Sequence, residues 1–541
     1  MSQAPFDRRS FVSCGVTLAG AALLSSRADA ASTTPGPHLR LDDVTSASAA
    51  ELQARMEQGG LSAETVTERY LARIAELDRK GPALQAVLEL NPQALEIAAE
   101  RDRERKAGRV RGPLHGIPIL VKDNIDTHDR MKTSAGSLAL AANTAPRDAF
   151  IIERLRSAGA VLLGKTNLSE WANFRSAHST SGWSARGGLT KNPHVLDRNT
   201  SGSSSGTAAA LCAGFAPLGI GTETDGSILS PSAVCGIVGI KPTVGLWSRS
   251  GIVPIAISQD TAGPMARSVA DAALLLGALA GVDPRDAATA PSDGKGQGDY
   301  TRALDENGLV GARIGVPRNL AGFHADVDRN LEQAVLALKQ AGAVLIDGLA
   351  LPTAGKFDDA ELEVLLYEFK AGIEAYLSTL SGHPPRTLLE LIAFNERERS
   401  HELAWFGQDL FERAAKKGPL TDAAYRTARA QCLEQTRARG LDPLFQEHRL
   451  EALICPTNQP AWTSDLVNGD HIIGGNTSFA AVAGYPSLTV PMGATRGLPL
   501  GLSFIGPAWS EARLIRLAYG FEQHTRARLE PRFLPTLERH G

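Results

Sequence analysis

The sequence predicts an α/β fold, in which one large mixed, mostly parallel, twisted sheet is covered by helices on both faces. The main observation is that strand-like apolar runs alternate with amphipathic helical patterns along almost the whole chain. A second observation is the composition, because 43% apolar and 21% charged residues over 541 positions are typical of an ordinary globular protein. The length and composition together indicate a core large enough to need no disulfide or metal.

The first third of the chain is predicted to begin with two helices. A capping box formed by Ser48 and Glu51 opens the first helix. The second carries apolar residues at helical spacing and ends at Gly81; these residues are Val66, Tyr70, Ile74 and Leu77. The pattern then predicts strands at 84–90, 117–121 and 160–164, with helices at 93–106 and 148–158. Residues 176–206 form a Gly-, Ser- and Asn-rich segment, and a loop of this length is usually functional.

The rest of the chain continues the alternation. Small apolar residues at 207–215, 219–221 and 233–240 indicate close backbone packing. A helix at 268–279 and a linker or surface loop at 281–300 precede a strand–helix–strand unit. The later elements are a helical region at about 358–438, strands at 452–455, 487–490 and 501–505, and a last helix at about 510–524.

The N-terminus is predicted to be a twin-arginine signal peptide covering residues 1–30. Arg8 and Arg9 precede an apolar stretch from Val12 to Leu24, and Ala28-Asp29-Ala30 matches a small-residue cleavage site. The apolar stretch is too short and too rich in Gly and Ser to span a membrane. The mature protein, residues 31–541, is therefore expected to be exported to the periplasm or secreted, without a membrane segment.

Charge and cysteine usage narrow the function classes. The net charge is −3 with His neutral, and charges of both signs are interspersed, so a nucleic-acid partner is not expected. The five cysteines form no C-x-x-C pair, no H-E-x-x-H motif occurs, and His residues are not closely paired. The sequence therefore predicts neither a metal site nor a cofactor, and buried free thiols are favoured at Cys212 and Cys455. The oligomeric state is left open.

The densest chemical signal is a Gly- and Ser-rich run at 200–206 followed by Ser227. One interpretation is a nucleophile elbow, because Gly202, Ser204 and Gly206 match G-x-S-x-G, with His383 or His471 as candidate bases. The segment before Ser204 is polar and contains Pro, whereas an elbow needs a strand there. The other interpretation is a Ser–Ser–Lys arrangement, in which Lys122, placed after three apolar residues, loses its charge by burial and serves as the base.

Five motifs carry a resemblance to the amidase signature family over nearly the whole mature chain. They are Gly116-Ile-Pro-Ile-Leu-Val-Lys-Asp-Asn124, Gly202-Ser-Ser-Ser-Gly206, Asp225-Gly-Ser-Ile228, Val238-Gly-Ile-Lys-Pro-Thr243 and Gly484-Tyr-Pro-Ser-Leu-Thr-Val-Pro491. The resemblance implies a single domain over 31–541 with the fold of that family. It also implies cleavage of linear amide C–N bonds through an acyl-enzyme, with the helical region at about 358–438 forming part of the substrate-side wall.

The resemblance also implies roles for individual residues. Lys122 matches the family's catalytic lysine, Ser203 its bridging serine with a cis peptide, and Ser227 its nucleophile; the 24-residue interval between the serines equals the family's spacing. The oxyanion hole is expected from the backbone N–H groups of Thr224, Asp225, Gly226 and Ser227.

Asp225 and Leu229 depart from the family's usual Gly and Arg. With Glu223 before it, Asp225 resembles the branch of the family that removes C-terminal amides from peptides, so a small-molecule or peptide amide is the expected substrate. A general aliphatic or aryl amidase, a glutamine-amidotransferase subunit and a non-enzymatic exported binding protein are the alternatives.

Overall fold

The computed structural model describes residues 41–538 and contains an 11-stranded sheet with the order β1-β3-β2-β6-β8-β7-β12-β13-β11-β9-β10. A separate two-stranded sheet is formed by β4 and β5. The strands are β1 (Val87–Leu90), β2 (Pro118–Lys122), β3 (Val161–Thr166), β4 (Trp183–Ser184), β5 (Gly188–Leu189), β6 (Leu218–Glu223), β7 (Val238–Lys241), β8 (Thr261–Ala266), β9 (Arg313–Pro317), β10 (Val344–Leu349), β11 (Ala452–Pro456), β12 (Ser487–Thr495) and β13 (Leu498–Ile505).

Helices join and cover these strands. The α-helices are α1 (Ala49–Glu57), α2 (Ala63–Leu77), α3 (Ala94–Lys106), α4 (Phe150–Ser157), α5 (Ser205–Cys212), α6 (Leu229–Val234), α7 (Val269–Leu279), α8 (Ala325–Gln340), α9 (Asp358–Thr379), α10 (Leu388–Arg397), α11 (Arg399–Glu402), α12 (Asp409–Ala415), α13 (Ala423–Leu433), α14 (Asp442–Glu447), α15 (Ser478–Ala483) and α16 (Glu511–Thr525). A π-helical segment, η7 (Glu434–Leu441), joins α13 to α14, and short 3-10 turns occupy Leu138–Leu140, Glu170–Asn173, Ala287–Ser292, Tyr300–Ala303 and Arg318–Leu320.

The sheet is mixed, and its parallel pairings lie toward its two ends. Parallel pairs join β2 to β3 and β6, and β9 to β10 and β11. The central strands β6, β8, β7, β12 and β13 run antiparallel, as do the β1–β3 and β11–β13 pairs. The prediction of a mixed sheet covered by helices is confirmed, but the parallel share is smaller than expected because several central neighbours pair antiparallel.

Strand β8 is absent from the elements that the sequence predicts, and it contains Gly263 and Pro264, two residue types that are uncommon in central strands. The structure accommodates both residues. Pairing with β7 involves only Met265 and Ala266, so Pro264 is paired on the β6 side alone, opposite Ile220. A Cβ at Gly263 would lie 2.1 Å from the carbonyl oxygen of Ile240, so this position requires glycine for close approach of the two chains.

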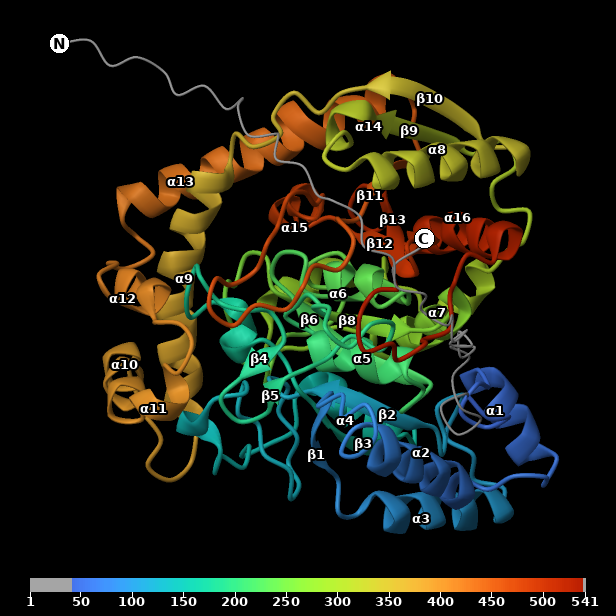
Figure 1. Cartoon of the computed structure of the whole chain (residues 1–541), viewed down its shortest axis with the longest axis vertical. Helices are drawn as coiled ribbons and strands as arrows, with labels where there is room; N and C mark the ends of the chain where they lie inside the picture. Colours follow the sequence, from blue (N-terminus) through green and yellow to red (C-terminus); the bar gives the residue numbers. More distant parts are fainter. Residues whose placement is uncertain (1–40, 539–541) are drawn as a thin grey trace, which may run out of the picture.

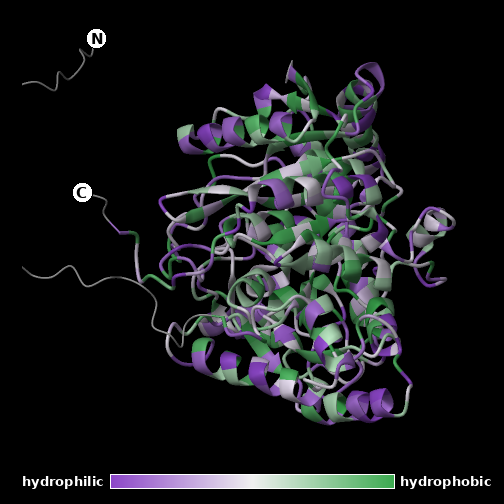
Figure 2. Cartoon of the chain, turned by 90° about the vertical axis from the view of Figure 1, so that its right-hand side faces the viewer, coloured by the Kyte–Doolittle hydropathy of each residue, from purple (hydrophilic) through white to green (hydrophobic). Residues whose placement is uncertain are grey.

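One large apolar core lies between the sheet and its covering helices. Helices α1 to α3 lie at the lower right of Figure 1, whereas β9, β10 and α8 lie at the top right. The apolar faces turn inward and polar residues cover the outer helices (Figure 2). The expected helix around 66–77 is present as α2, with Val66, Tyr70, Ile74 and Leu77 fully buried, and the capping box at Ser48 forms as predicted.

Helices α9 to α13 stand along one side of the molecule (orange, left in Figure 1). They have their own apolar cluster, which includes Phe369 and Phe411 stacked at a 5.0 Å centroid distance. A fully buried ion cluster ties this region to the residues just before the Gly-rich segment, because Arg175 contacts both Glu170 and Glu402 of α11. This cluster and the apolar contacts fix α9 relative to the sheet.

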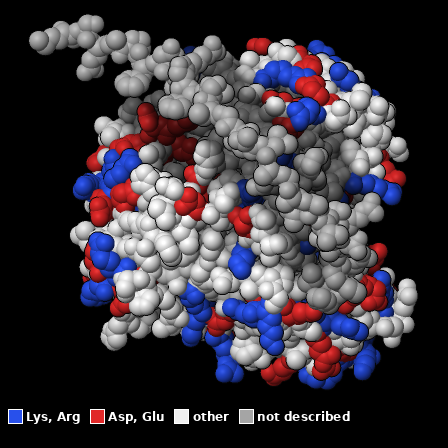
Figure 3. Space-filling model, in the orientation of Figure 1, with Lys and Arg blue, Asp and Glu red and all other residues white. Residues whose placement is uncertain are grey.

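The proposed signal peptide at residues 1–30 lies outside the described residues. Between residues 41 and 538, no helix is both long and apolar enough to cross a bilayer. Cys212, Cys235, Cys432 and Cys455 are buried free thiols. Positive and negative side chains are interspersed on the face seen in Figure 3.

Candidate active site

Lys122 occupies the C-terminal end of β2, between the parallel strands β3 and β6. All five residues of β2 are buried, and the Lys122 side chain is fully inaccessible to solvent. Burial lowers the pKa of Lys122 well below its ordinary value, although the nearby Glu223 and Asp260 carboxylates oppose the shift. The fold therefore favours the neutral amine at this position.

Three oxygen atoms surround the Lys122 amine. Its Nζ lies 2.8 Å from Ser203 Oγ, 2.9 Å from Thr222 Oγ1 and 3.1 Å from the carbonyl oxygen of Thr222. A neutral amine carries two N–H bonds and one lone pair. It can donate both N–H groups to the two Thr222 oxygens and keep its lone pair for the Ser203 hydroxyl. The arrangement is therefore suited to accepting a proton from Ser203.

The three serines at 203–205 have different hydrogen-bond partners: one binds Lys122 and two bind the backbone. Ser204 Oγ donates to the carbonyl oxygen of Thr222 at 3.1 Å and accepts from Thr222 N at 3.2 Å. Ser205 Oγ donates to the carbonyl oxygen of Ser201 at 2.6 Å. Ser203 is the member that meets Lys122, and the Gly202–Ser203 peptide is cis. Because Thr222 binds both Ser204 and Lys122, it holds the serine run against the lysine.

Ser227 lies in the turn between β6 and α6. Its carbonyl oxygen accepts from Ser204 N at 3.1 Å, which places this turn directly beside the serine run. The Glu223 carboxylate folds back and accepts from Ile228 N at 2.7 Å and Leu229 N at 2.9 Å. Ser227 is 7% exposed, so solvent reaches it while Lys122 and Ser203 are sealed.

The residues just before Ser227 are held by hydrogen bonds to the start of α15 and to Asp260. Asp225 accepts hydrogen bonds from Thr477 Oγ1 at 2.6 Å and Ser478 Oγ at 2.5 Å, both at the start of α15. Gly226 has a φ of +75°, and a Cβ there would lie 2.9 Å from Thr477 Oγ1. Thr224 donates from Oγ1 to Asp260 Oδ1 at 2.5 Å. These contacts brace the backbone from Thr224 to Ser227, and the Asp225 side chain supports the turn.

A cavity of about 280 Å³ opens at Ser227, and we call it the serine cavity. Its apolar walls include Phe174, Ile255 and Trp462, together with Leu365 of α9. Thr224, Asp225, Gly226 and Ser227 all line it, and Asp225 is its one acidic residue among the described part of the chain. The cavity brings together Ser227 and the predicted oxyanion-hole residues, whereas Ser203 and Lys122 are fully buried and do not line it.

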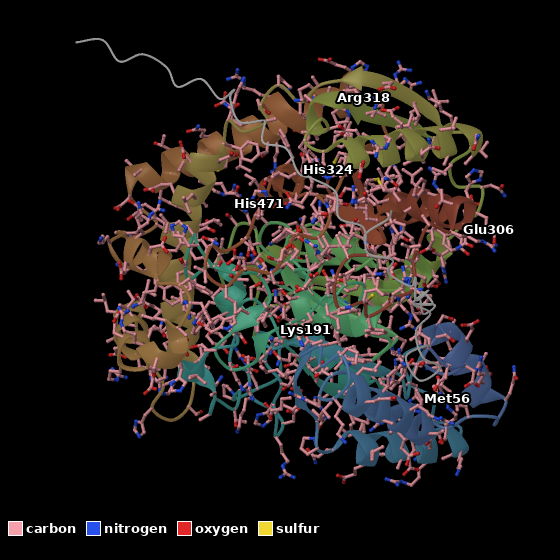
Figure 4. All side chains as sticks on the ribbon, in the orientation of Figure 1. Met56, Lys191, Glu306, Arg318, His324 and His471 are labelled. Carbon is pink, nitrogen blue, oxygen red and sulfur yellow. The ribbon has the colours of Figure 1, made fainter. Side chains whose placement is uncertain are left out.

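The nucleophile-elbow interpretation of Ser204 is wrong. Within the described chain, no strand lies directly before Ser204, and its side chain is fully buried against the β6 backbone. His471 lines a smaller cavity together with His324, and both are labelled in the upper part of Figure 4.

Several residues that the sequence does not single out complete the site. Thr222 binds Lys122, and Asn124 donates from Nδ2 to Thr222 Oγ1 at 2.9 Å. Asn458 donates from Nδ2 to Ser230 Oγ at 2.6 Å on the far wall of the serine cavity. Asn124 belongs to the same sequence motif as Lys122, so the sequence marks its position. Asn458 comes from a loop that carries no motif.

A family model described as Amidase matches residues 65–515. Together with the fold and the Lys122–Ser203–Ser227 neighbourhood, this match defines a serine amidase, a hydrolase of linear amides. The chain belongs to the amidase signature family.

Among proteins of known structure, the chain is similar to the native peptide amidase of Stenotrophomonas maltophilia. The two are 53% identical with a TM-score of 0.88, covering 91% of this chain and 99% of that one. A probable amidase of Arabidopsis thaliana is 40% identical over 493 residues, covering 90% of this chain and 91% of the relative. A glutamyl-tRNA(Gln) amidotransferase subunit of Symbiobacterium thermophilum is 35% identical over 494 residues, covering 88% of this chain and 97% of the relative.

Proposed function

We propose that this serine amidase removes the C-terminal amide of peptides, releasing ammonia and the peptide acid. Ser227 is the nucleophile, Ser203 passes the proton and Lys122 is the base. The observation that carries the proposal is the 2.8 Å contact between a fully buried Lys122 amine and Ser203 Oγ, next to Ser204, whose N–H donates to the Ser227 carbonyl oxygen at 3.1 Å. A lysine held neutral in this way activates a hydroxyl without histidine.

The reaction follows from these positions. Lys122 takes the Ser203 proton while Ser203 takes that of Ser227, and Ser227 Oγ attacks the amide carbon. The proton returns through Ser203 to the departing nitrogen, which leaves as ammonia, and Ser227 keeps the acyl group as an ester. A water molecule, deprotonated along the same route, then attacks the ester carbon and restores the Ser227 hydroxyl.

The negative charge of the tetrahedral intermediate needs hydrogen-bond donors that are already in place. Ile228 N and Leu229 N are occupied by Glu223, whereas the N–H groups of Asp225, Gly226 and Ser227 have no acceptor among residues 41–538. We assign these groups, with Thr224 N, to the oxyanion hole. The Asp225 and Thr224 side-chain contacts keep them fixed during the reaction.

Two features favour a peptide amide over a simple amide. One is the 53% identity to a peptide amidase over almost the whole of that chain. The other is the wall of the serine cavity, because its apolar residues Phe174, Ile255 and Trp462 can hold a peptide side chain beside Ser227.

The test is ammonia release from a panel of substrates. We expect amidated di- and tripeptides to be hydrolysed with a higher kcat/KM than free amino-acid amides or benzamide, with the peptide acid identified by mass spectrometry. Equal rates for peptide amides and benzamide would reject the peptide assignment. Ammonia release from glutamine that requires a partner subunit would instead favour the amidotransferase alternative.

The activity is expected to fall as the pH is lowered. Protonation removes the lone pair of Lys122, so kcat/KM decreases below the Lys122 pKa; because burial depresses that pKa, the decrease begins at a lower pH than an ordinary lysine would give. Burial also raises the pKa of Asp126 and of Asp260 to about 6, so these carboxyls titrate in the acid range too. Burial also raises the pKa of Glu223 and of Asp225, which hold the Ser227 turn. An acid limb that survives in Asp126→Asn, Asp260→Asn, Glu223→Gln and Asp225→Asn variants belongs to Lys122. A profile that stays flat far into the acid range contradicts the assignment.

Export through the twin-arginine route is part of the same proposal. It is supported by Arg8-Arg9 followed by an apolar stretch and a small-residue cleavage site.

A further inference from the structure

The carbonyl oxygen of Thr224 is held by a buried glutamine that takes no part in proton transfer. Gln259 is fully buried and donates from Nε2 to the carbonyl oxygen of Thr224 at 3.4 Å. This carbonyl and the Asp225 N–H belong to one peptide group, which is planar and trans. The two groups therefore point in opposite directions, so the donor that holds the Thr224 oxygen also sets the direction of the Asp225 N–H.

The Asp225 N–H is one of the donors assigned to the oxyanion hole, because it has no acceptor among residues 41–538. Its direction matters, since such a donor must already be aimed at the oxygen when negative charge develops. A hydrogen bond to the carbonyl oxygen of a peptide group also polarises that group and strengthens its N–H as a donor. Gln259 thus acts on the oxyanion hole from outside the serine cavity, which it does not line.

Gln259 is needed because the other contacts leave this peptide group free to turn. Asp260 holds the Thr224 side chain, accepting from its Oγ1 at 2.5 Å, and the start of α15 holds the Asp225 side chain. With both ends held, the peptide plane between them can still rotate through opposite changes in ψ of Thr224 and φ of Asp225. The Gln259 contact restrains this rotation.

The second N–H of the Gln259 amide is fixed by helix α9. It donates to Glu361 Oε1 at 2.8 Å, and Glu361 is 8% exposed in the first turn of that helix. Leu365 stands about one helical turn later on the same face and lines the serine cavity. The face of α9 that forms a wall of the serine cavity therefore also holds Gln259.

We propose that Gln259 and Glu361 are positioning residues for the amidase reaction, and that they aim the Asp225 N–H at the oxyanion of the tetrahedral intermediate. The inference rests on the proposed nucleophile and oxyanion hole. Neither side chain touches the reacting atoms, so their effect is confined to the steps in which charge develops on the substrate oxygen. Substrate binding before that point should be almost unaffected.

The main test is Gln259→Leu, which roughly keeps the side-chain volume and removes both N–H donors. We expect kcat for the best amide substrate to fall about tenfold to hundredfold, part of what loss of one oxyanion donor costs, while KM stays within about twofold. A peptide aldehyde, which adds to Ser227 and places its oxygen in the oxyanion hole, should lose affinity by the same factor. Affinity of the Ser227→Ala protein for the intact peptide amide should change little when Gln259→Leu is added.

Two Glu361 variants test the second contact. Glu361→Gln keeps an Oε1 acceptor for Gln259 and is expected to stay within about threefold of wild type in kcat, whereas Glu361→Leu removes the acceptor and should lower kcat. Because both residues act through one contact, the double variant Gln259→Leu/Glu361→Leu should lose no more than Gln259→Leu alone. Losses that add, or a Glu361→Gln variant as slow as Glu361→Leu, would overturn the inference.

Gln408→Leu is the matched control. Gln408 is 3% exposed, and its Nε2 likewise donates to a backbone carbonyl, that of Ile392 at 3.3 Å, and to a glutamate, Glu396, at 3.2 Å. It does not line the serine cavity, so its loss should lower the Tm but keep kcat and aldehyde affinity within about twofold.

The comparison of the two glutamine variants decides the outcome. If Gln259→Leu lowers kcat and aldehyde affinity no more than Gln408→Leu does, or weakens substrate and aldehyde binding equally, the role of Gln259 is structural and the inference is wrong. A wild-type protein that neither binds the aldehyde nor releases ammonia from any amide instead overturns the proposed function, and the inference with it.

Discussion

Replacing Ser227 by alanine is expected to lower kcat for peptide amides by roughly four to six orders of magnitude, as loss of a nucleophile does in other serine hydrolases. The neighbouring serine hydroxyls cannot take its place in the present geometry. Ser203 is sealed beneath the surface against Lys122, and Ser204 is committed to the β6 backbone. Single-turnover ammonia release and thermal unfolding of the same sample separate lost chemistry from lost structure.

Ser230→Ala provides the matched control for this experiment. Ser230 lines the same cavity, and its hydroxyl contacts Ser201 Oγ at 2.7 Å and Asn458 Nδ2 at 2.6 Å, so it belongs to the wall and not to the proton route. We expect Ser230→Ala to change KM more than kcat. A fluorophosphonate probe should label wild-type protein at Ser227 and leave Ser227→Ala unlabelled. A Ser227→Ala enzyme that keeps a substantial part of its turnover would assign the nucleophile elsewhere.

The local parts of this site can be predicted because short stretches of sequence carry them. Apolar residues before Lys122 indicate a buried strand end, and β2 ends at that residue. The Gly-rich segment at 176–206 indicates a functional loop, and it delivers Ser203 to Lys122. These inferences depend on one element at a time, so periodicity and turn chemistry are sufficient.

The parts that sequence reasoning misses depend on contacts between distant segments. In the sequence Asp225 marks a substrate class, but in the structure its carboxylate binds Thr477 and Ser478, which are 252 and 253 positions away. Tyr376 stands in none of the sequence motifs, yet it lines a second cavity of about 380 Å³ and donates to Asp126 Oδ1 at 2.8 Å. The sequence also does not show which strands are neighbours or in which direction they pair. That β6 pairs antiparallel with β8 is decided by the packing of the whole sheet.

Replacing Lys122 by methionine is expected to lower kcat by about two to four orders of magnitude, the range that a general base contributes. Methionine keeps most of the volume but has no lone pair that can take the Ser203 proton. Stability should not suffer in proportion. The wild-type fold already holds this amine away from water and depresses its pKa, so replacing it by an apolar side chain relieves a desolvation cost. The expected signature is a folded protein with a Tm at or above that of wild type and very low turnover.

Lys165→Met is the control that separates loss of proton transfer from loss of a buried lysine. Lys165 is also fully buried, its pKa is also lowered by burial, and it lies on the adjacent strand β3 opposite Val121. Its amine donates to the carbonyl oxygen of Ile125 at 2.6 Å and to Thr133 Oγ1 at 3.0 Å, away from Ser203. Loss of Lys165 should therefore lower stability, because the buried Asp123 loses a nearby positive charge, while the folded fraction keeps most of its kcat. If the two lysine variants lose turnover equally, burial and not proton transfer explains the Lys122 effect, and the base must be sought among the carboxylates around Thr224.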